Sequence, residues 1–472
     1  MRPPGYDFAR EAAAGLADAR LQRALAEVPG GFVAGRERAT AKLPEFEALR
    51  RQARDLKDHA LANLDLYLEA FERNATAAGT KVHWAATAAD ANAIVLDICR
   101  AASARLVIKS KSMVSEEIGL AARLEAAALE VVETDLGEYL IQLRSEMPSH
   151  IIAPAIHLTP ADIAADFRRS HADLPPDRDL SSPEQMVAEA RAVLRRKFLS
   201  ADVGITGANF LIADTGSAVI VSNEGNADLT LSLPRVHIIL TSIEKVVPTH
   251  GDAFALLRVL ARSATGQEFT AYTTFINGPR RAADPDGPEE CHVVLLDSCR
   301  SEMLGSELRP ALRCIRCGAC MNYCPVYGAI GGHAYGSVYP GPIGAVLTPA
   351  LPATHDDGEL AGASTFCGRC ETVCPVEIPL VSLMRTWRRT AFAKAGWRQR
   401  LLLRAWAALA RRPAVYHRAA RLVVALLGRL GRKRGAFARL PFAEDWTRSR
   451  DFPAPQGATF QAQWARRQRG RL

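Results

Sequence analysis

The 472-residue chain carries a formal net charge of +8 and ten cysteines. Because one hydrophobic core seldom serves a chain of this length, we expect two or more domains. Its apolar segments are interrupted by charges well short of the ~18 residues that a membrane-spanning helix requires, so no transmembrane helix is predicted. The opening segment has no apolar core behind a basic start, so we predict no secretory signal, a cytoplasmic location and reduced cysteines.

A long amphipathic pattern over residues 42–77 predicts a helix near the start of the chain. After it, β-branched runs at 80–86, 105–112 and 130–136 alternate with alanine-rich segments of helical pattern. This alternation predicts a parallel sheet that is covered by helices. A further buried strand is expected at 292–298.

Glycines surround a predicted strand at residues 218–223. Gly204, Gly207 and Gly216 share this stretch with several Asn and Asp residues. Glycine lets a ligand approach backbone amides closely, as in phosphate and carboxylate cradles. The alternative is that these glycines simply form turns between strands, and the sequence leaves both interpretations open.

Four polar side chains of the α/β region are candidates for carboxylate binding or proton transfer. They are Lys109 and Lys111 in the segment IKSKS, and His150 and His157 in the segment PSHIIAPAIH. A structural role is the alternative for each of them.

Seven of the ten cysteines lie between residues 314 and 374, which is more crowding than a disulfide framework needs. From Cys314 the spacing is C-x2-C-x2-C-x3-C-P, the bacterial ferredoxin pattern for a 4Fe–4S cluster. In that pattern three close thiolates hold one cluster, and the fourth cysteine binds the other cluster of the pair. Zinc is the alternative, but zinc sites use paired C-x2-C units, often with histidine. His333 follows the motif closely and either donates a hydrogen bond to a cluster sulfur or is a loop residue.

A second motif, which ends at Pro375, repeats the first with Ser364 in place of the leading cysteine. Exchange of the fourth cysteines predicts one complete ligand set and one set of only three thiolates. The complete set is Cys314, Cys317, Cys320 and Cys374, and the incomplete set is Cys324, Cys367 and Cys370. At the open corner, Ser364 supplies an alkoxide, water or a small molecule caps the iron, or the iron is absent and the cluster is 3Fe–4S. Alternatively, Ser364 is only a helix N-cap.

The other three cysteines are Cys99, Cys291 and Cys299. Cys99 lies in an apolar run and is expected to be a small buried hydrophobic residue. The other two flank the strand that is predicted at 292–298, so structural roles are expected for all three.

The basic character of the chain comes from its C-terminal region. Residues 385–472 hold 22 Lys and Arg against 3 Asp and Glu, a net charge of +19, which leaves −11 for the rest of the chain. Trp387, Trp397 and Trp406 alternate with Leu and Arg at helical spacing, as in a helix that lies on a membrane surface. The alternative is a helix whose apolar face packs on its own protein. No recognised nucleic-acid module accompanies this charge, so no nucleic-acid partner is expected.

Several segments together resemble the lactate-utilisation protein B family, the iron–sulfur subunits of a bacterial complex that oxidises L-lactate. The segments are CIRCGACMNYCPVY, GGHAYGSVYPGPIGAVLTP, STFCGRCETVCPV, ETDLGEYLIQL, PSHIIAPAIH and ADTGSAVIVSNEGN. The resemblance extends from about Arg38 into the basic tail, and the combination is far more specific than any one segment.

The resemblance implies an α/β lactate-utilisation domain, with a fold similar to sugar-phosphate isomerases and CoA transferases, and then an α-helical ferredoxin domain with two 4Fe–4S clusters. It implies the same two ligand sets that the spacing predicts. The implied partners are a subunit with a cysteine-rich motif and a second lactate-utilisation-domain subunit. We therefore expect a helical segment, an α/β domain, a ferredoxin-type domain and a basic helical tail, at residues 1–75, 76–300, 301–385 and 386–472.

The expected function is electron transfer during the oxidation of L-lactate to pyruvate. No G-x-G-x-x-G fingerprint follows a first strand, so a flavin or nicotinamide held by that motif is not evident. Iron–sulfur clusters move single electrons, whereas lactate oxidation releases two, so partner subunits are expected to share the chemistry. Two alternatives stay open: a subunit that itself binds and oxidises lactate, and a docking module for another 2-hydroxy-acid oxidoreductase. Through its basic tail the protein is further expected to associate with the inner face of the membrane.

Overall fold

The computed structural model describes residues 6–352, 358–440, 447 and 450–470. Compactness divides the chain into two units, Met1–Ala391 and Phe392–Leu472. The first three predicted domains all lie within the first unit, and most of the predicted tail forms the second.

A six-stranded sheet forms the centre of the first unit, and every neighbouring pair of its strands is parallel. In spatial order its strands are β1 (Lys81–Ala85), β10 (Glu290–Leu296), β7 (Val236–Ser242), β4 (Val203–Thr206), β2 (Leu106–Lys109) and β3 (Glu130–Glu133). The prediction of a parallel sheet with covering helices is therefore confirmed. The central strands are buried along their whole length, as expected when helices cover both faces of a sheet.

Helices on the two faces of this sheet bury alternate residues of each strand. Val107 of β2 packs in one core with three covering helices, whereas Leu106 and Ile108 pack in another core on the opposite face. The helices of the first core are α6 (Ala88–Ala101), α7 (Met113–Glu117) and α8 (Leu120–Glu125). Those of the second are α9 (Leu136–Arg144), α10 (Pro160–Ser170) and α11 (Pro183–Ser200).

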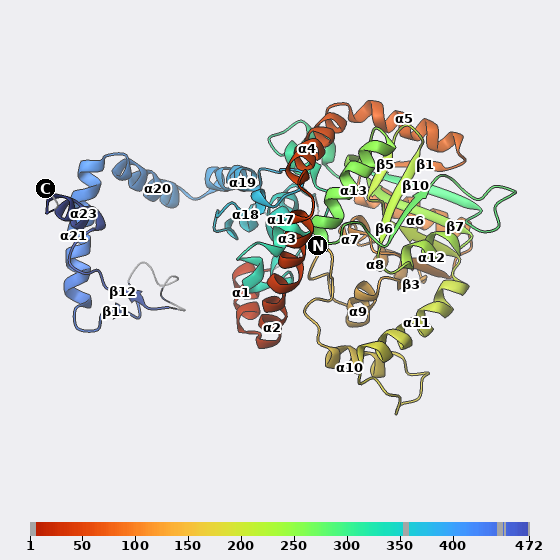
Figure 1. Ribbon diagram of the computed structural model, residues 1–472, viewed down its shortest axis with the longest axis horizontal. Coiled ribbons are helices and arrows are strands. Elements are labelled where there is room, and N and C mark those ends of the chain that lie inside the picture. The colour runs from red at the N-terminus through yellow and green to blue at the C-terminus, as the bar shows by residue number, and fades with distance from the viewer. Residues whose placement is uncertain (1–5, 353–357, 441–446, 448–449, 471–472) are drawn as a thin grey trace. The chain divides into compact units, whose positions relative to one another are not determined.

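A smaller, four-stranded sheet packs beside the first. Its strands are β8 (Val246–Val247), β5 (Phe210–Ile212), β6 (Ser217–Ser222) and β9 (Tyr272–Ile276), in that spatial order. The predicted strand at 218–223 is β6, which pairs antiparallel with both β5 and β9. Helices α12 (Asn226–Ser232) and α13 (His250–Ala264) complete this part. In Figure 1 the green strands of this sheet lie beside α13.

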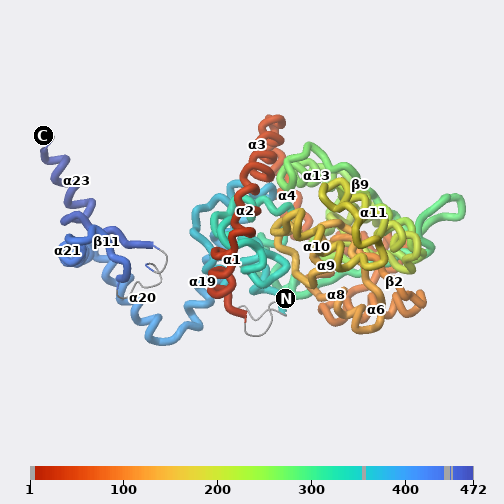
Figure 2. The backbone as a smooth tube through the Cα atoms, turned by 90° about the horizontal axis from the view of Figure 1, so that it is seen from below, coloured from red at the N-terminus to blue at the C-terminus, as the bar shows by residue number. Residues whose placement is uncertain are grey.

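Of the five N-terminal helices, the first four contact the ferredoxin part of the chain, far away in sequence, and the fifth packs on the α/β part. They are α1 (Phe8–Ala17), α2 (Ala19–Val28), α3 (Ala34–Ala41), α4 (Phe46–Ala62) and α5 (Leu64–Ala77). The single helix expected over residues 42–77 is instead two helices, because the backbone at Asn63 leaves the helical region. Helices α1 and α2 contact α16 (Tyr327–Ile330). In both Figure 1 and Figure 2, α1 lies beside the teal part of the chain.

The ferredoxin part consists of short helices joined by tight turns. After α14 (Arg300–Leu304) come α15 (Ala319–Asn322), α16, α17 (Gly341–Leu347), α18 (Arg369–Thr372) and α19 (Leu380–Lys394), which reaches the boundary between the two units. Three tyrosines with almost no exposed surface fill its core, namely Tyr327, Tyr335 and Tyr339. These turns determine where the seven cysteines lie.

The second unit contains α20 (Trp397–Ala410), α21 (Pro413–Gly431), α23 (Phe460–Arg469) and the two-residue strands β11 (Ala436–Phe437) and β12 (Phe452–Pro453). No residue of α20 is buried, and the side chains of Trp397 and Trp406 are among the most exposed apolar groups of the unit. Trp387 differs, because its indole lies in the first unit and donates a hydrogen bond to the carbonyl of Val346. In the described ranges no helix combines the length and apolar character needed to span a bilayer.

Candidate iron–sulfur centres and an adjoining pocket

The structure brings four of the seven cysteines around one small cavity. They are Cys314, Cys317, Cys320 and Cys374, the set that exchange of fourth cysteines predicts. Cys374 comes from the second motif, and the turn after α18 returns it to the three cysteines of the first motif. The Cys374 thiol accepts a hydrogen bond from the backbone N–H of Ile378 at 3.4 Å, a contact that stabilises negative charge on sulfur.

The other three cysteines form a second group at the contact between α15 and α18. Burial and the nearby charges of Cys324, Glu371 and Cys367 raise the pKa of Cys370 to about 12. Cys367 is exposed, and the N–H of Arg369 lowers the pKa of its thiol. The second group therefore reaches the protein surface, whereas Cys317 and Cys374 of the first group are buried.

The residues on either side of Cys317 and of Cys367 have the same unusual backbone. Arg316 and Gly318 have φ of +59° and +73° in the first turn, and Phe366 and Gly368 have φ of +53° and +81° in the second. Left-handed φ is uncommon for side chains such as Arg and Phe, so its recurrence shows that the two motifs are structural repeats. Because of this repeat, the backbone around Cys317 has the same conformation as the backbone around Cys367.

Ser364 occupies the position of the missing cysteine, and its hydroxyl accepts a hydrogen bond from the N–H of Phe366 at 3.1 Å. The N-cap of α18 is Gly368, so the interpretation of Ser364 as a helix N-cap is wrong. The serine caps its own turn because its short hydroxyl side chain reaches a backbone N–H two residues later.

The spacing of the thiols is too wide for zinc. Four cysteines around one zinc ion, with Zn–S bonds of about 2.3 Å, would have sulfur atoms about 4 Å apart. Among the residues with described positions, no three cysteine sulfurs lie within 4.8 Å of one another. The arrangement instead suits a larger group with ligands at its corners, such as a 4Fe–4S cluster.

Two arginines of the N-terminal helices fix the backbone around Cys374. Arg50 of α4 donates two hydrogen bonds to the carbonyl of Cys374, at 2.9 and 3.0 Å, and Arg36 of α3 donates one to the carbonyl of Val373 at 3.1 Å. Both arginines are buried. Sequence reasoning missed them, although an arginine on the apolar face of the pattern at 42–77 was an available signal for Arg50.

A buried network of charges lies beside the first cysteine group. Arg300 pairs with Glu117 at 2.7 Å and with Glu244 at 2.9 Å, and Tyr339 donates to Glu117 at 2.7 Å. The guanidinium of Arg316 stacks over the ring of Tyr339, 4.4 Å from its centroid, and lies 3.5 Å from Glu244. Burial alone would raise the pKa of Glu244, but the two arginines bring it down to about 2. Glu244 is therefore a carboxylate at neutral pH.

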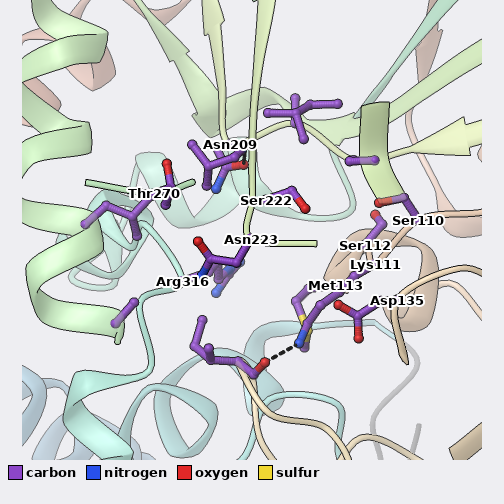
Figure 3. A pocket seen from close by; sticks show the side chains of 18 of the residues that line it. Ser110, Lys111, Ser112, Met113, Asp135, Asn209, Ser222, Asn223, Thr270 and Arg316 are labelled. Carbon is purple, nitrogen blue, oxygen red and sulfur yellow. Dashed lines mark hydrogen bonds between the residues drawn. The ribbon is translucent and has the colours of Figure 1, made fainter. Parts of the chain in front are cut away.

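A cavity of about 280 Å³ opens at the carboxyl ends of the parallel strands, between the two sheets. Segments that follow β2, β3, β4 and β7 contribute to its wall, together with β6 and the first cysteine motif. Its polar lining includes Lys111, Asp135, Asn209, Ser222, Lys245 and Arg316 (Figure 3). Ligands of open α/β proteins bind at this edge of the sheet.

The three predicted glycines have different surroundings. Gly207 lines this cavity and lies against Ser112. Gly204 packs so closely on the carbonyl of Thr230 that a Cβ would lie 1.9 Å from it, and Gly216 has a φ of +68° in the turn before β6. Only Gly207 is therefore placed to contact a ligand in the cavity.

The two lysines that the sequence suggested for carboxylate binding also differ in their surroundings. Lys111 lines the cavity, where its ammonium donates to the carbonyl of Ile152 at 2.9 Å, as Figure 3 shows. Lys109 is fully buried and pairs with Glu116 at 2.7 Å and Glu133 at 2.6 Å. Burial opposes the charge of Lys109, but these carboxylates raise its pKa above the ordinary value. Lys109 therefore has the structural role that was its alternative.

His150 joins the α/β part to the ferredoxin part. Its Nδ1 accepts from the N–H groups of Ile152 and Ala153, so the proton is on Nε2, which donates to Asn322 at 2.8 Å. Burial lowers the pKa of His150 to about 4, so the imidazole is neutral. All of its hydrogen-bonding capacity is used, which leaves nothing for proton transfer to a substrate.

His157 and His333 lie together beside Glu146. His157 is 2.8 Å from the carboxylate of Glu146, and its ring centroid is 4.6 Å from that of His333. The Nε2 of His333 donates to the carbonyl of Met147 at 2.8 Å. This nitrogen is therefore engaged with the backbone, and the hydrogen bond from His333 to a cluster sulfur stays a prediction.

Cys99 and Cys291 are buried, as expected of structural residues, and Cys299 is partly buried. Burial raises the pKa of Cys99 to about 12 and that of Cys291 to about 11, so both are inert thiols. Cys299 precedes α14 in a left-handed conformation.

The fold and the cysteine geometry define a class of protein with an α/β domain followed by an iron–sulfur domain. Comparison with family models gives the same division: a LUD domain matches residues 68–296, and a 4Fe–4S dicluster domain matches residues 310–378. Iron–sulfur clusters are thus the cofactors of this chain.

The chain belongs to the lactate utilization protein B family. It is 42% identical to lactate utilization protein B of Geobacillus thermodenitrificans, covering 98% of this chain and 95% of the relative. It is 40% identical to the Bacillus licheniformis protein of the same name, covering 96% and 95%. An Escherichia coli protein named as an uncharacterized electron transport protein is 43% identical, covering 84% and 82%.

Among solved structures, a DUF162 family protein from Deinococcus radiodurans matches 50% of this chain and 98% of its own length. The sequence identity is 13% and the TM-score is 0.28, a similarity too low to carry an argument about fold.

Proposed function

We propose that this protein is the electron-transfer subunit of a complex that oxidises L-lactate to pyruvate. The observation that carries the proposal is the assembly of seven cysteines into two neighbouring groups beside an α/β domain. The names of the relatives, which refer to lactate utilization and to electron transport, support it. We further propose that the α/β domain shares the fold of sugar-phosphate isomerases and CoA transferases, which its helix-covered parallel sheet supports.

In this proposal the two cysteine groups hold one 4Fe–4S cluster each. Cys314, Cys317, Cys320 and Cys374 hold the first, and Cys324, Cys367 and Cys370 hold the second, with Ser364 or an exogenous group at its open corner. Bound clusters supply single-electron transfer. The chain itself orients the thiols through Arg36, Arg50 and the N–H of Ile378, and buries Cys317 and Cys374 of the first group.

Electron exchange with partner subunits is proposed to occur at the second group, because Cys367 is exposed whereas the cysteines of the first group are buried or partly buried. The oxidation of lactate to pyruvate releases two electrons and two protons, so a partner has to couple the two-electron step to single-electron transfer. The proposed partners are a subunit with a cysteine-rich motif and another subunit with a lactate-utilisation domain.

We also propose that the second unit binds the anionic inner surface of a membrane. On α20, large apolar side chains are exposed among arginines, with Trp397 at 65%, Leu402 at 71% and Trp406 at 62% exposure. Leu422 and Leu430 of α21 are 73% and 67% exposed. Exposed apolar surface beside a high positive charge is typical of helices that bind membrane interfaces.

The ligand assignment is tested by potentiometric titration of two alanine variants. Cys374→Ala should remove the redox transition of the first cluster and leave that of the second. Cys324→Ala should do the reverse, and more severely, because only two thiolates would remain in its group. Loss of the same transition in both variants would contradict the exchange of fourth cysteines. A wild-type protein with clusters but no reversible transition would contradict electron transfer itself.

A further inference from the structure

One end of the cavity between the two sheets holds a buried ammonium group without a partner. Lys245 follows β7, is only 5% exposed and lines the cavity. In the described part of the chain its Nζ has no hydrogen bond and no carboxylate within 4.0 Å. Buried lysines are rare unless paired, so an unpartnered one that faces a cavity indicates a ligand of negative charge.

Arg316 supplies a second cation at the same end. Its Nη1 is buried and has no hydrogen-bond partner among the described residues, although its Nη2 lies 3.5 Å from Glu244. Tyr339 holds the guanidinium from the side by stacking at 4.4 Å. The left-handed φ of +59° at Arg316 is a conformation that costs a non-glycine residue of order 1 kcal/mol, and such outliers cluster at functional sites.

Neutral polar groups and carboxylates are distributed unevenly around the cavity. Asn209 uses its Oδ1 to accept from the N–H of Val221 at 3.0 Å, which leaves its amide N–H groups for a ligand. Asp135 and Glu224 are at the end that holds Lys111, where they accept from the backbone of α9. A ligand with one anionic end and one uncharged polar end fits this arrangement. The second negative charge of a dianion would instead be repelled by the carboxylates of Asp135 and Glu224. Figure 3 shows Arg316 and Asn209 on the side away from Asp135.

The cavity is adjacent to the first cysteine group. Arg316 stands between Cys314 and Cys317, and both Arg316 and Ile151 line this cavity as well as the small one surrounded by the four cysteines. Its volume of about 280 Å³ is near the lower end of the range for small-molecule sites, about 300–1,000 Å³, and suits a compound of a few carbons.

We propose that this cavity binds a small 2-hydroxy or 2-oxo monocarboxylate, with its carboxylate between Lys245 and Arg316 and its hydroxyl or oxo group toward Asn209. The class of acid rests on the proposed function, whereas the preference for an anion rests on the two cations. A bound carboxylate places negative charge beside the first cluster. By linkage, it should bind more weakly when that cluster is reduced, and should lower the reduction potential of that cluster alone.

Calorimetric titration of the purified, cluster-containing protein tests the site, with L-lactate, pyruvate and inorganic phosphate as separate probes. Saturable binding of at least one of the two acids is expected, with weaker binding of phosphate. Lys245→Gln should weaken binding about tenfold or more, the usual effect of deleting a charge-assisted hydrogen bond. The matched control is Lys197→Gln, which removes the same charge from an exposed lysine paired with Glu130 and should leave the affinity unchanged.

Two results would overturn the proposal. If neither acid binds saturably, the cavity is not a carboxylate site. If phosphate binds as tightly as the acids, the cavity is a general anion site and not one for carboxylates. Arg316→Gln is a weaker test because it is part of the first motif and can release iron, so its iron content has to be measured beside its affinity.

Potentiometric titration with saturating ligand separates this inference from the proposed function. The ligand that binds should lower the midpoint potential of one transition in the wild type and of neither in Lys245→Gln. Binding without any shift would overturn the placement beside the first cluster. Reversible transitions without any ligand binding would leave electron transfer intact and refute only the carboxylate site.

Discussion

Replacing Arg50 by methionine should loosen the backbone that presents Cys374 to the first cysteine group. Methionine keeps much of the aliphatic volume of Arg50 but deletes both of its hydrogen bonds to the Cys374 carbonyl, at 2.9 and 3.0 Å. A hydrogen bond from a charged donor contributes about 1.5–3 kcal/mol, and the two bonds share one acceptor. We therefore expect a loss of about 2–3 kcal/mol in the free energy of unfolding of the part that contains the N-terminal helices and the first group.

The matched control is Arg54→Met, one turn later on the same helix. Arg54 also bridges to the second motif, through Glu377 at 2.6 Å, but both side chains are partly exposed. Exposed ion pairs contribute little because solvent screens them. This variant should therefore unfold at nearly the wild-type urea concentration.

Urea unfolding, followed by the visible absorbance of the clusters and by far-UV circular dichroism, measures the difference. With a slope of about 2–3 kcal/mol per molar urea, Arg50→Met should shift the absorbance midpoint down by about 1 M. The two probes need not coincide, because a protein with bound metal clusters does not have to unfold in one step. Equal midpoints for Arg50→Met and Arg54→Met would refute the claim that Arg50 secures Cys374.

Three further predictions concern the open corner, the tail and pH. Ser364→Cys should complete the second thiolate set, so that a 3Fe–4S signal in the EPR spectrum of the oxidised wild type disappears; identical spectra and iron contents would mean that residue 364 is not at the cluster. The full-length protein should sediment with anionic vesicles at low salt and be released by salt, whereas a chain ending at Lys394 should not sediment; binding that survives truncation would place the attraction elsewhere. Burial and the adjacent His292 lower the pKa of His237 to about 3, so the unfolded chain takes up a proton below about pH 6.5 that the folded chain does not. Stability should thus fall with decreasing pH by up to about 1.4 kcal/mol per unit, and less steeply in His237→Gln, as urea midpoints at pH 7 and pH 5 would show; equal slopes would exclude His237 as a source.

The sequence by itself determined the features that depend on local pattern and spacing. Alternating β-branched and alanine-rich segments were enough to predict the helix-covered parallel sheet, because period and burial are properties of short segments. Spacing of the cysteines predicts two ligand sets, because the ferredoxin repeat fixes the order of its ligands along the chain, and the four cysteines of the first set line one cavity. That each set holds a cluster stays a prediction. The break at Asn63 was not predictable from the apolar pattern, which continues through it.

Tertiary structure alone decided which polar residues have partners and which do not. Lys109, Lys111 and Lys245 are equally lysines in the sequence, but only the fold pairs the first with two glutamates, gives the second a backbone carbonyl and leaves the third facing a cavity. In the same way, Arg50 reaches Cys374 across more than three hundred residues of chain. Such contacts depend on how distant segments pack. Burial then makes the free energy gained by pairing a charge, or lost by leaving it unpaired, larger than it would be in water.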